Sequence, residues 1–259
     1  MKNGVTIYGN FIGTETTLAQ RTLTYPLSTT LSGDIGTPMS TYDNSYHVVY
    51  NPQGLNASAV LDGVLITAGN ANGPFPDYDG GGMYNDGFRG VCSPTIRNCA
   101  FVGNSTSSNG GGVYNYSNQS GTVAATFTHR LFLNNAASEG GGVVGNFGDN
   151  SIAAFTNCSF GDNTGSYGGA LYNPADTRTT LINCILFGNG AGGIINGGNG
   201  TVVANYRSFN RYGSGFCFGA MVQWLPITAC SRHQLAVTPG LATSLPLHRR
   251  LYRPSAICN

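Results

Sequence analysis

The chain has 259 residues, a net charge of +1, 9% charged residues, 41% hydrophobic residues and 39 glycines. Such a small net charge creates no long-range field that would attract a polyanion, so the composition argues against a nucleic-acid or anionic-membrane partner. The hydrophobic content is too high for a charge-rich disordered chain. The many glycines favour a turn-rich β protein.

The N-terminal segment, residues 1–8, lacks the apolar core of a signal peptide and already has the pattern of a β-strand. No apolar run approaches the roughly 18 residues needed to cross a bilayer, so no membrane-spanning segment is predicted. A strand at the very start of a chain would have no earlier strand to pair with. We therefore expect this chain to be a fragment of a longer protein.

Residues 1–58 are predicted to form a less regular N-terminal part of the fold. Three short strands are expected within residues 4–12, 31–36 and 46–50, and the turn residues of 51–54 end the third strand. The run at 59–67 is the first that resembles the later repeats.

From residue 80 onward, a two-part motif recurs. Its first part is a glycine cluster followed by apolar residues, with clusters beginning at Gly80, Gly110, Gly140, Gly168 and Gly192. Its second part ends in asparagine, at Asn104, Asn135, Asn163, Asn189 and Asn210, so the copies are 31, 28, 26 and 21 residues apart. Helical repeats need a 3.6-residue apolar period that is absent here, and propeller blades need about 40 residues. The period therefore predicts an all-β parallel β-helix, with regular repeats over residues 59–204.

In such a solenoid, coils stack about 4.8 Å apart and equivalent residues form rows. We expect three interior rows: Ile96 with Phe155, Cys99 with Cys158, and Phe101 with Phe160. Asparagines at the turns should bond the backbone of neighbouring coils, because buried turn amides need partners.

Seven cysteines cannot all pair within one chain. Cys99, Cys158 and Cys184 recur at one repeat position, which favours buried free thiols over disulfides. The second copy has His129-Arg130 where the others have Asn-Cys. Because a buried arginine is costly, a local register shift that turns Arg130 outward is predicted.

The paired motifs resemble the repeats of the polymorphic outer-membrane protein family and related secreted β-helix repeat proteins of bacteria. The clearest pair is Gly81-Gly82-Met83-Tyr84 with Phe101-Val102-Gly103-Asn104, which recurs at 111–114 with 132–135 and at 141–144 with 160–163. The resemblance covers roughly residues 3–204. It implies a right-handed parallel β-helix of about six coils in an extracellular or outer-membrane protein that often serves in adhesion. It implies no catalytic residue.

Residues 205–259 depart from this pattern, since they contain no acidic residue and show no periodicity. Two explanations stay open: a divergent cap over the last coil, which solenoids need, or a shifted reading frame. In this tail we expect low order, with any strand confined to residues 215–224.

The acidic residues do not recur in phase, which argues against an enzyme. Glu139, Asp149, Asp162 and Asp176 occur singly, whereas an acid–base pair needs two carboxyls about 5–10 Å apart. Asp77, Asp79 and Asp86 flank the first glycine cluster, where they form either a solvated loop or a calcium site. We favour the solvated loop and predict no catalytic, cofactor-binding or metal-binding residue and no cofactor.

Tyrosines recur beside the glycine clusters at Tyr84, Tyr114 and Tyr172. Facing outward they would form a stripe suited to a sugar or a protein, and facing inward they would belong to the core. Val144 and Ile195 at the equivalent positions favour the core or partial burial.

The predicted function is a non-enzymatic, adhesin-like surface protein with an unidentified surface glycan or protein ligand. The alternative is a carbohydrate-active β-helix enzyme, a polysaccharide lyase or hydrolase.

Overall fold

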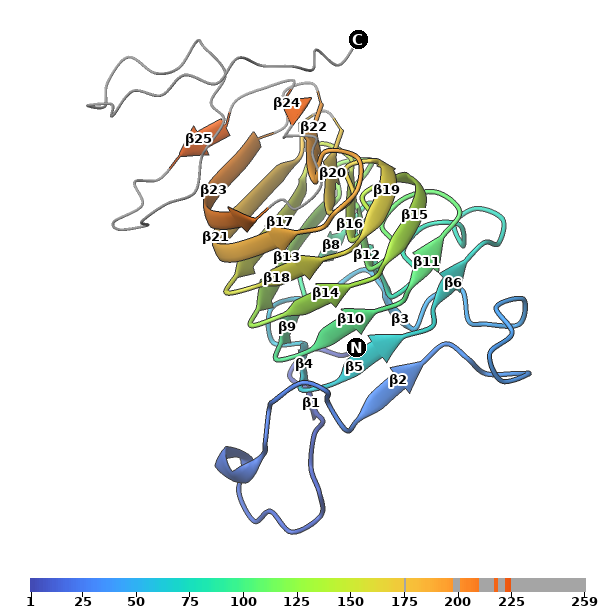
Figure 1. The fold of residues 1–259 in the computed structure, drawn as a ribbon, viewed down its shortest axis with the longest axis vertical. Coiled ribbons are helices and arrows are strands. Elements are labelled where there is room, and N and C mark those ends of the chain that lie inside the picture. The colour runs from blue at the N-terminus through green and yellow to red at the C-terminus, as the bar shows by residue number, and fades with distance from the viewer. Residues whose placement is uncertain (175, 198–200, 210–216, 219–221, 225–259) are drawn as a thin grey trace.

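A computed structural model of the chain shows a parallel β-helix (Figure 1). It describes residues 1–174, 176–197, 201–209, 217–218 and 222–224. In these residues the regular structure is almost all strand, joined by one short 3-10 helix, η1 (Leu18–Gln20). The prediction of an all-β parallel solenoid is confirmed.

The strands form three parallel sheets of 14, 7 and 4 strands. The 14-stranded sheet covers two sides of the solenoid and is continuous through β21, so we describe four faces, each a stack of parallel strands from successive coils. Face 1 contains β1 (Thr6–Tyr8), β4 (Val60–Asp62), β8 (Val91–Cys92), β9 (Thr95–Arg97), β13 (Thr122–Thr128), β17 (Ser151–Thr156), β21 (Arg178–Phe187), β23 (Thr201–Phe209) and β25 (Val222–Trp224). Face 2 contains β2 (Thr30–Ser32), β5 (Leu65–Thr67), β10 (Ala100–Val102), β14 (Leu131–Leu133), β18 (Ser159–Gly161) and the ends of β21 and β23. Face 3 contains β6 (Asn70–Ala71), β11 (Ser105–Thr106), β15 (Ala136–Gly140) and β19 (Thr164–Tyr167). Face 4 contains β3 (Val49–Asn51), β7 (Met83–Asp86), β12 (Val113–Tyr116), β16 (Val144–Phe147), β20 (Leu171–Asn173), β22 (Ile194–Asn196) and β24 (Cys217–Phe218).

The N-terminal part forms the first coil of the helix. Its three predicted strands are present as β1, β2 and β3, and they pair in parallel with β4, β5 and β7 of the next coil. Two long excursions, residues 9–29 and 33–48, separate these strands and hide the period in the sequence. At the other end, β23 continues through Phe209, beyond the predicted limit of the regular repeats at residue 204. Most of the predicted tail, 205–259, lies outside the described residues.

In the middle coils the chain turns from face 1 to face 2 through one residue with positive φ. In four successive coils these residues are Asn98, His129, Asn157 and Asn183, with φ of 52°, 56°, 54° and 52°. Asparagine tolerates this left-handed conformation better than most residues. The turn has the same geometry in these four coils, so the residue that follows it points into the interior in each of them.

Aromatic rows fill the interior, as predicted. In face 1 the row runs from Ile96 through Phe127 to Phe155, and the two phenylalanine rings stack with centroids 4.8 Å apart. In face 2, Phe132 stacks on Phe101 at 5.1 Å and on Phe160 at 4.9 Å. The row of Ile96 and Phe155 is therefore confirmed, with Phe127 of the intervening coil between them.

Two asparagine ladders hold the coils together. At the corner after face 2, the Asn135 side chain donates to Phe101 O at 2.9 Å and to Asn163 Oδ1 at 3.0 Å. These bonds confirm the prediction that turn asparagines bind neighbouring coils. The second ladder lies inside face 4, where Asn85 Nδ2 donates to Asn115 Oδ1 at 2.7 Å and the pattern repeats from Asn51 to Asn173. Sequence reasoning missed it, although an asparagine follows the recurrent tyrosine in several repeats.

Arg130 points into the core, and the prediction that it turns outward is wrong. His129 occupies the positive-φ corner like the asparagines of other coils, and Phe132 stays paired with both Phe101 and Phe160. The register is therefore preserved, and Arg130 falls in the slot that cysteine fills elsewhere. It is 3% exposed, and its Nε, Nη1 and Nη2 have no hydrogen-bond partner.

Replacing Arg130 with methionine is expected to stabilise the protein. The substitution removes a buried charge and leaves an apolar side chain of similar length, a change worth about 1–4 kcal/mol in other proteins. Burial lowers the pKa of Arg130 to about 10, which reports the same cost of holding the charge in the core. Urea denaturation of R130M and the parent chain measures the difference. A lower unfolding midpoint for R130M would show that the guanidinium makes a favourable interaction.

The cysteines of the interior are free thiols, as predicted. Among the described residues, Cys92, Cys99, Cys158 and Cys184 are all buried and unpaired by disulfides. Cys158 Sγ, for example, donates to Thr156 O at 3.4 Å.

Candidate ligand-binding face

The outer side of face 4 carries a cluster of aromatic side chains, which we call the aromatic patch. Strand pairing places Tyr50, Tyr84 and Tyr114 in one row, and it places Tyr116 beside Phe147. Side chains alternate along a strand, so these rings lie opposite the inward Met83 and Val113 of the core. Loop residues complete the patch, which consists of His47, Tyr50, Phe75, Tyr78, Tyr84, Phe88, Tyr114, Tyr116 and Phe147.

The rings contact one another across successive coils. Tyr50 stacks on Tyr84 with centroids 5.6 Å apart and planes 20° apart. Tyr116 is the centre of the patch, since it stacks on Phe88 at 6.0 Å and on Phe147 at 5.8 Å and meets the edge of Phe75 at 6.5 Å. Offset pairs of this kind add roughly 0.5–1.5 kcal/mol each beyond simple burial, so the patch is a preformed surface.

The patch has a buried part and an exposed part. Tyr84 and Tyr114 are only 2% and 5% exposed, whereas Tyr50, Phe147 and Phe75 are 45%, 43% and 65% exposed. The backbone before face 4 covers the inner rings, since a Cβ added to Gly80 would lie 3.0 Å from Tyr114 Cβ. The predicted burial is confirmed for Tyr84 and Tyr114, and Tyr172 is partly buried. The rings of Tyr84 and Tyr114 nevertheless lie on the outer side, so their placement in the interior core is wrong.

Polar contacts fix the exposed edge of the patch. The hydroxyl of Tyr50 donates to Asp86 Oδ2 at 2.7 Å, and burial together with this bond raises the pKa of Tyr50. His47 Nδ1 lies 3.0 Å from Gly80 O, and its Nε2 lies 3.3 Å from Asp77 Oδ1. Asp86 Oδ1 accepts from the Phe88 backbone N–H at 2.9 Å, whereas Asp77 Oδ2 is not engaged by His47 and can accept a hydrogen bond from a ligand.

The three acids of the first glycine cluster do not converge. Asp77 faces His47, Asp86 accepts from Tyr50, and Asp79 accepts from the Asn109 backbone N–H at 2.8 Å. Burial raises the pKa of Asp79, which disfavours its charged form. Nowhere in the described part of the chain do three His, Cys, Asp or Glu side chains form a group that could hold a metal ion.

The other acids considered for catalysis are dispersed. Asp149, Asp162 and Asp176 are exposed in separate turns. Glu139 accepts a bond from Ser108 Oγ at 3.2 Å, and its charge contributes to raising the pKa of Tyr78, although burial is the main cause there. Glu139 therefore adds a negative charge next to the aromatic patch.

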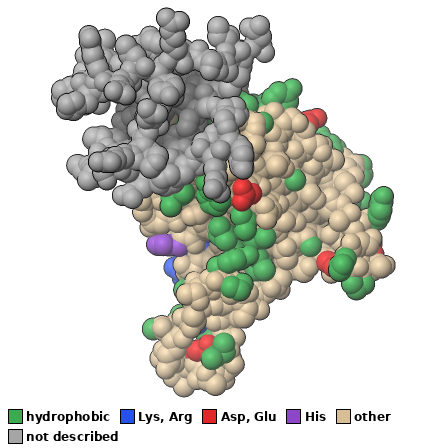
Figure 2. Space-filling model, in the orientation of Figure 1, with side chains coloured by type: hydrophobic (Ala, Val, Ile, Leu, Met, Phe, Trp, Pro, Cys, Tyr) green, Lys and Arg blue, Asp and Glu red, His purple; other side chains and the backbone are tan. Residues whose placement is uncertain are grey.

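A second apolar surface lies on the outer side of face 2. Figure 2 shows hydrophobic side chains gathered over β10 and β14, and strand pairing places Leu65, Leu131 and Ile185 in one row there, with Val102 and Leu133 in the next. The rows of this surface also contain the hydroxyls of Ser159, between Leu131 and Ile185, and of Thr67, beside Val102. The aromatic patch instead offers stacked rings bordered by carboxylates and is the better candidate for specific binding.

No family model, curated protein or solved structure matches the chain. The resemblance to polymorphic outer-membrane repeats therefore stays a prediction. In the described residues, no helix has both the length and the apolar character required to cross a membrane.

Proposed function

We propose that this chain is part of an exported, adhesin-like surface protein that binds a neutral glycan without cleaving it. The observation that carries the proposal is the aromatic patch, with exposed rings of Tyr50, Phe75 and Phe147 on a rigid solenoid face. Flat aromatic rings offer apolar surface that matches the C–H faces of sugars. The resemblance of the repeats to those of polymorphic outer-membrane proteins supports the location at the cell surface.

The charges around the patch favour an uncharged ligand. Asp77, Asp79, Asp86 and Glu139 all lie beside its rings or act on their hydroxyls. Such a grouping repels anionic polysaccharides, whereas a carboxylate oxygen such as Asp77 Oδ2 can accept a hydrogen bond from a sugar hydroxyl. The same residues argue against turnover, because His47 and Tyr50 already engage the carboxylates that a general acid or base would need free.

Removing exposed rings is expected to weaken glycan binding. Each of Y50A and F147A should raise the dissociation constant for a neutral polysaccharide about tenfold, as expected for central aromatic contacts. Calorimetry with soluble neutral β-glucan and mannan, beside polygalacturonate as the anionic comparison, measures the effect. Y42A is the matched control, because Tyr42 is 95% exposed in a loop outside the patch.

Three results would contradict the proposal. One is equal affinity in Y50A, F147A and the parent chain. Another is a preference for polygalacturonate over both neutral polymers. The third is release of reducing ends that stops when a single acid such as Asp86 is changed to asparagine, which would identify an enzyme.

A further inference from the structure

Two further tyrosines lie beside the aromatic patch, in the coil that follows Phe147. Tyr167 is the last residue of β19 and is 56% exposed, and Tyr172 lies on β20 and is half-buried. Their ring centroids are 6.0 Å apart and their planes 31° apart, so the two rings pack together. We call them the tyrosine pair.

The backbone of the preceding coil fixes the tyrosine pair. Gly140 of β15 is paired with Tyr167 of β19, and the ring of Tyr172 packs on the same glycine. A Cβ added to Gly140 would lie 2.3 Å from Tyr172 Cδ1, so only glycine leaves room for the ring at this position. The tyrosine pair is therefore a preformed surface, like the aromatic patch.

The tyrosine pair is in line with the aromatic patch. Strand pairing places Tyr172 in the row of Tyr114, with Gly145 between them. Two coil spacings separate the tyrosines, which is about 10 Å along the solenoid axis. Because Gly145 has no side chain, no side chain of this row stands between the two groups of rings.

A column of stacked residues also joins the two groups of rings. Ser108 N donates to Tyr78 O at 3.1 Å, and Glu139 N donates to Ser108 O at 2.9 Å. In the next coil, Tyr167 O accepts from Gly141 N at 2.8 Å, two residues after Glu139. Tyr78 of the patch and Tyr167 of the pair are therefore three coils apart, or about 14 Å along the axis.

Glu139 is a polar group between the patch and the tyrosine pair. Its side chain is exposed, and Oε2 accepts from Ser108 Oγ at 3.2 Å. A carboxylate can accept several hydrogen bonds, so Glu139 can also accept one from a sugar hydroxyl. Burial is the main cause that raises the pKa of Tyr78 and of Tyr172, and the charge of Glu139 adds to both effects, which agrees with its place between them.

We propose that Tyr167, Tyr172 and Glu139 form a second subsite for the neutral glycan, and that this glycan is a linear chain lying along the solenoid axis. One sugar stacks on the exposed rings of the aromatic patch, a later sugar stacks on Tyr167, and a hydroxyl between them donates to Glu139. The inference rests on the proposed function and adds the length and direction of the ligand.

Binding of glycans of different length tests the second subsite. A disaccharide is shorter than the span from Tyr78 to Tyr167, whereas a hexasaccharide exceeds it. In calorimetry with both oligomers of neutral β-glucan and of mannan, the parent chain should bind one hexasaccharide at least about tenfold more tightly than its disaccharide. Y167A should lose this gain without weaker binding of the disaccharide, and Y167F, which keeps the ring, should bind as the parent chain does.

G140A tests the position of Tyr172 without removing a ring. The added methyl group displaces the Tyr172 ring, so the affinity for the hexasaccharide should fall while that for the disaccharide stays the same. Urea denaturation shows whether G140A keeps its fold, and Y167A decides the question if it does not, because Tyr167 is 56% exposed. Y42A is the control, since Tyr42 is 95% exposed in a loop outside both groups of rings.

The outcomes separate this inference from the proposed function. The second subsite is overturned if Y167A binds the hexasaccharide as tightly as the parent chain, or if Y167A weakens both oligomers equally, while Y50A and F147A still weaken binding. If Y50A and F147A have no effect either, the proposed function fails together with the second subsite.

Discussion

Replacing Phe132 with alanine is expected to lower the free energy of unfolding by about 3–5 kcal/mol. Phe132 is fully buried and contacts four other rings, with centroids 5.1 Å from Phe101, 6.0 Å from Phe127, 5.8 Å from Phe155 and 4.9 Å from Phe160. These rings belong to three successive coils, so alanine would leave a cavity at the boundary between coils.

Urea denaturation followed by circular dichroism measures the loss in F132A. The matched control is F147A, which removes an aromatic ring that is 43% exposed and should cost less than about 1 kcal/mol. F132L should lie between them, because Leu186 fills the same interior row two coils later. If F132A and F147A cost the same, the interior rows would not be the source of the solenoid's stability.

The period of the sequence predicts the interior rows because each coil passes each face once. Residues one period apart therefore lie at the same position in successive coils. Phe101, Phe132 and Phe160 recur with the motif, and the structure pairs them in register. The first coil shows no period in the sequence, since its strands are separated by excursions of different lengths. A period is visible in the sequence where the segments between strands are short. Before residue 59 these segments are long, so no period is visible there.

Two other features depend on information that a repeat pattern does not contain. The cost of burying a charge predicts that Arg130 faces outward, but the corner geometry set by His129 directs its side chain into the core. Tyr84 and Tyr114 are outward by strand alternation yet buried, because a neighbouring segment covers them. Residue type predicts whether a side chain is buried, whereas the backbone conformation decides whether it lies on the inner or the outer side of a solenoid face.

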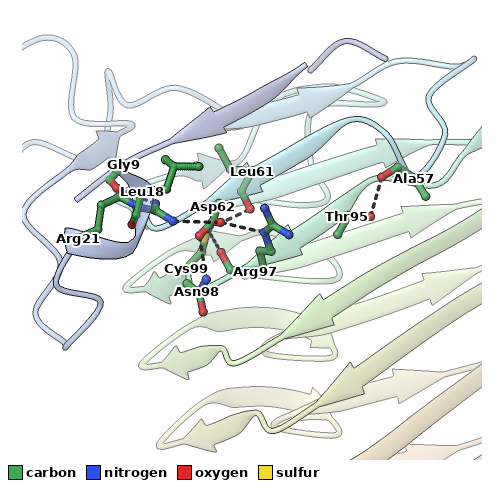
Figure 3. A network of polar contacts seen from close by, with 10 residues as sticks. All are labelled: Gly9, Leu18, Arg21, Ala57, Leu61, Asp62, Thr95, Arg97, Asn98 and Cys99. Atoms are coloured by element: carbon green, nitrogen blue, oxygen red, sulfur yellow. Dashed lines mark hydrogen bonds and ion pairs between the residues drawn. The ribbon is translucent and has the colours of Figure 1, made fainter. Parts of the chain in front are cut away.

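Replacing Asp62 with asparagine is expected to cost about 3–5 kcal/mol, the usual cost of removing one partner from a buried ion pair. Asp62 is 2% exposed, and its Oδ2 lies 3.3 Å from Arg21 Nη2 and 2.8 Å from Arg97 Nε. Figure 3 shows these two arginines and Asn98 directed at the one carboxylate, which also accepts from Asn98 Nδ2 at 2.8 Å. Asparagine would leave the buried Arg21 cation without its counter-charge.

The loss should appear first in the excursion at residues 9–29. Arg21 anchors it by donating from Nη1 to Gly9 O at 3.0 Å, and its guanidinium lies 4.9 Å from the centre of the Tyr8 ring. In D62N this anchor weakens, so trypsin should cleave after Arg21 faster than in the parent chain. D149N is the control, because Asp149 is exposed in a turn between β16 and β17.

The two readouts of D62N separate a local effect from a global one. If trypsin cleaves after Arg21 while the urea midpoint is unchanged, Asp62 anchors only the excursion. If both change, the carboxylate also holds the second coil to the third, since Asp62 lies on β4 while Arg97 lies on β9 of the next coil. Equal stability and equal cleavage in D62N and D149N would contradict the ion-pair network. Because the carboxylate is buried, the effect should persist at high salt, unlike that of an exposed pair.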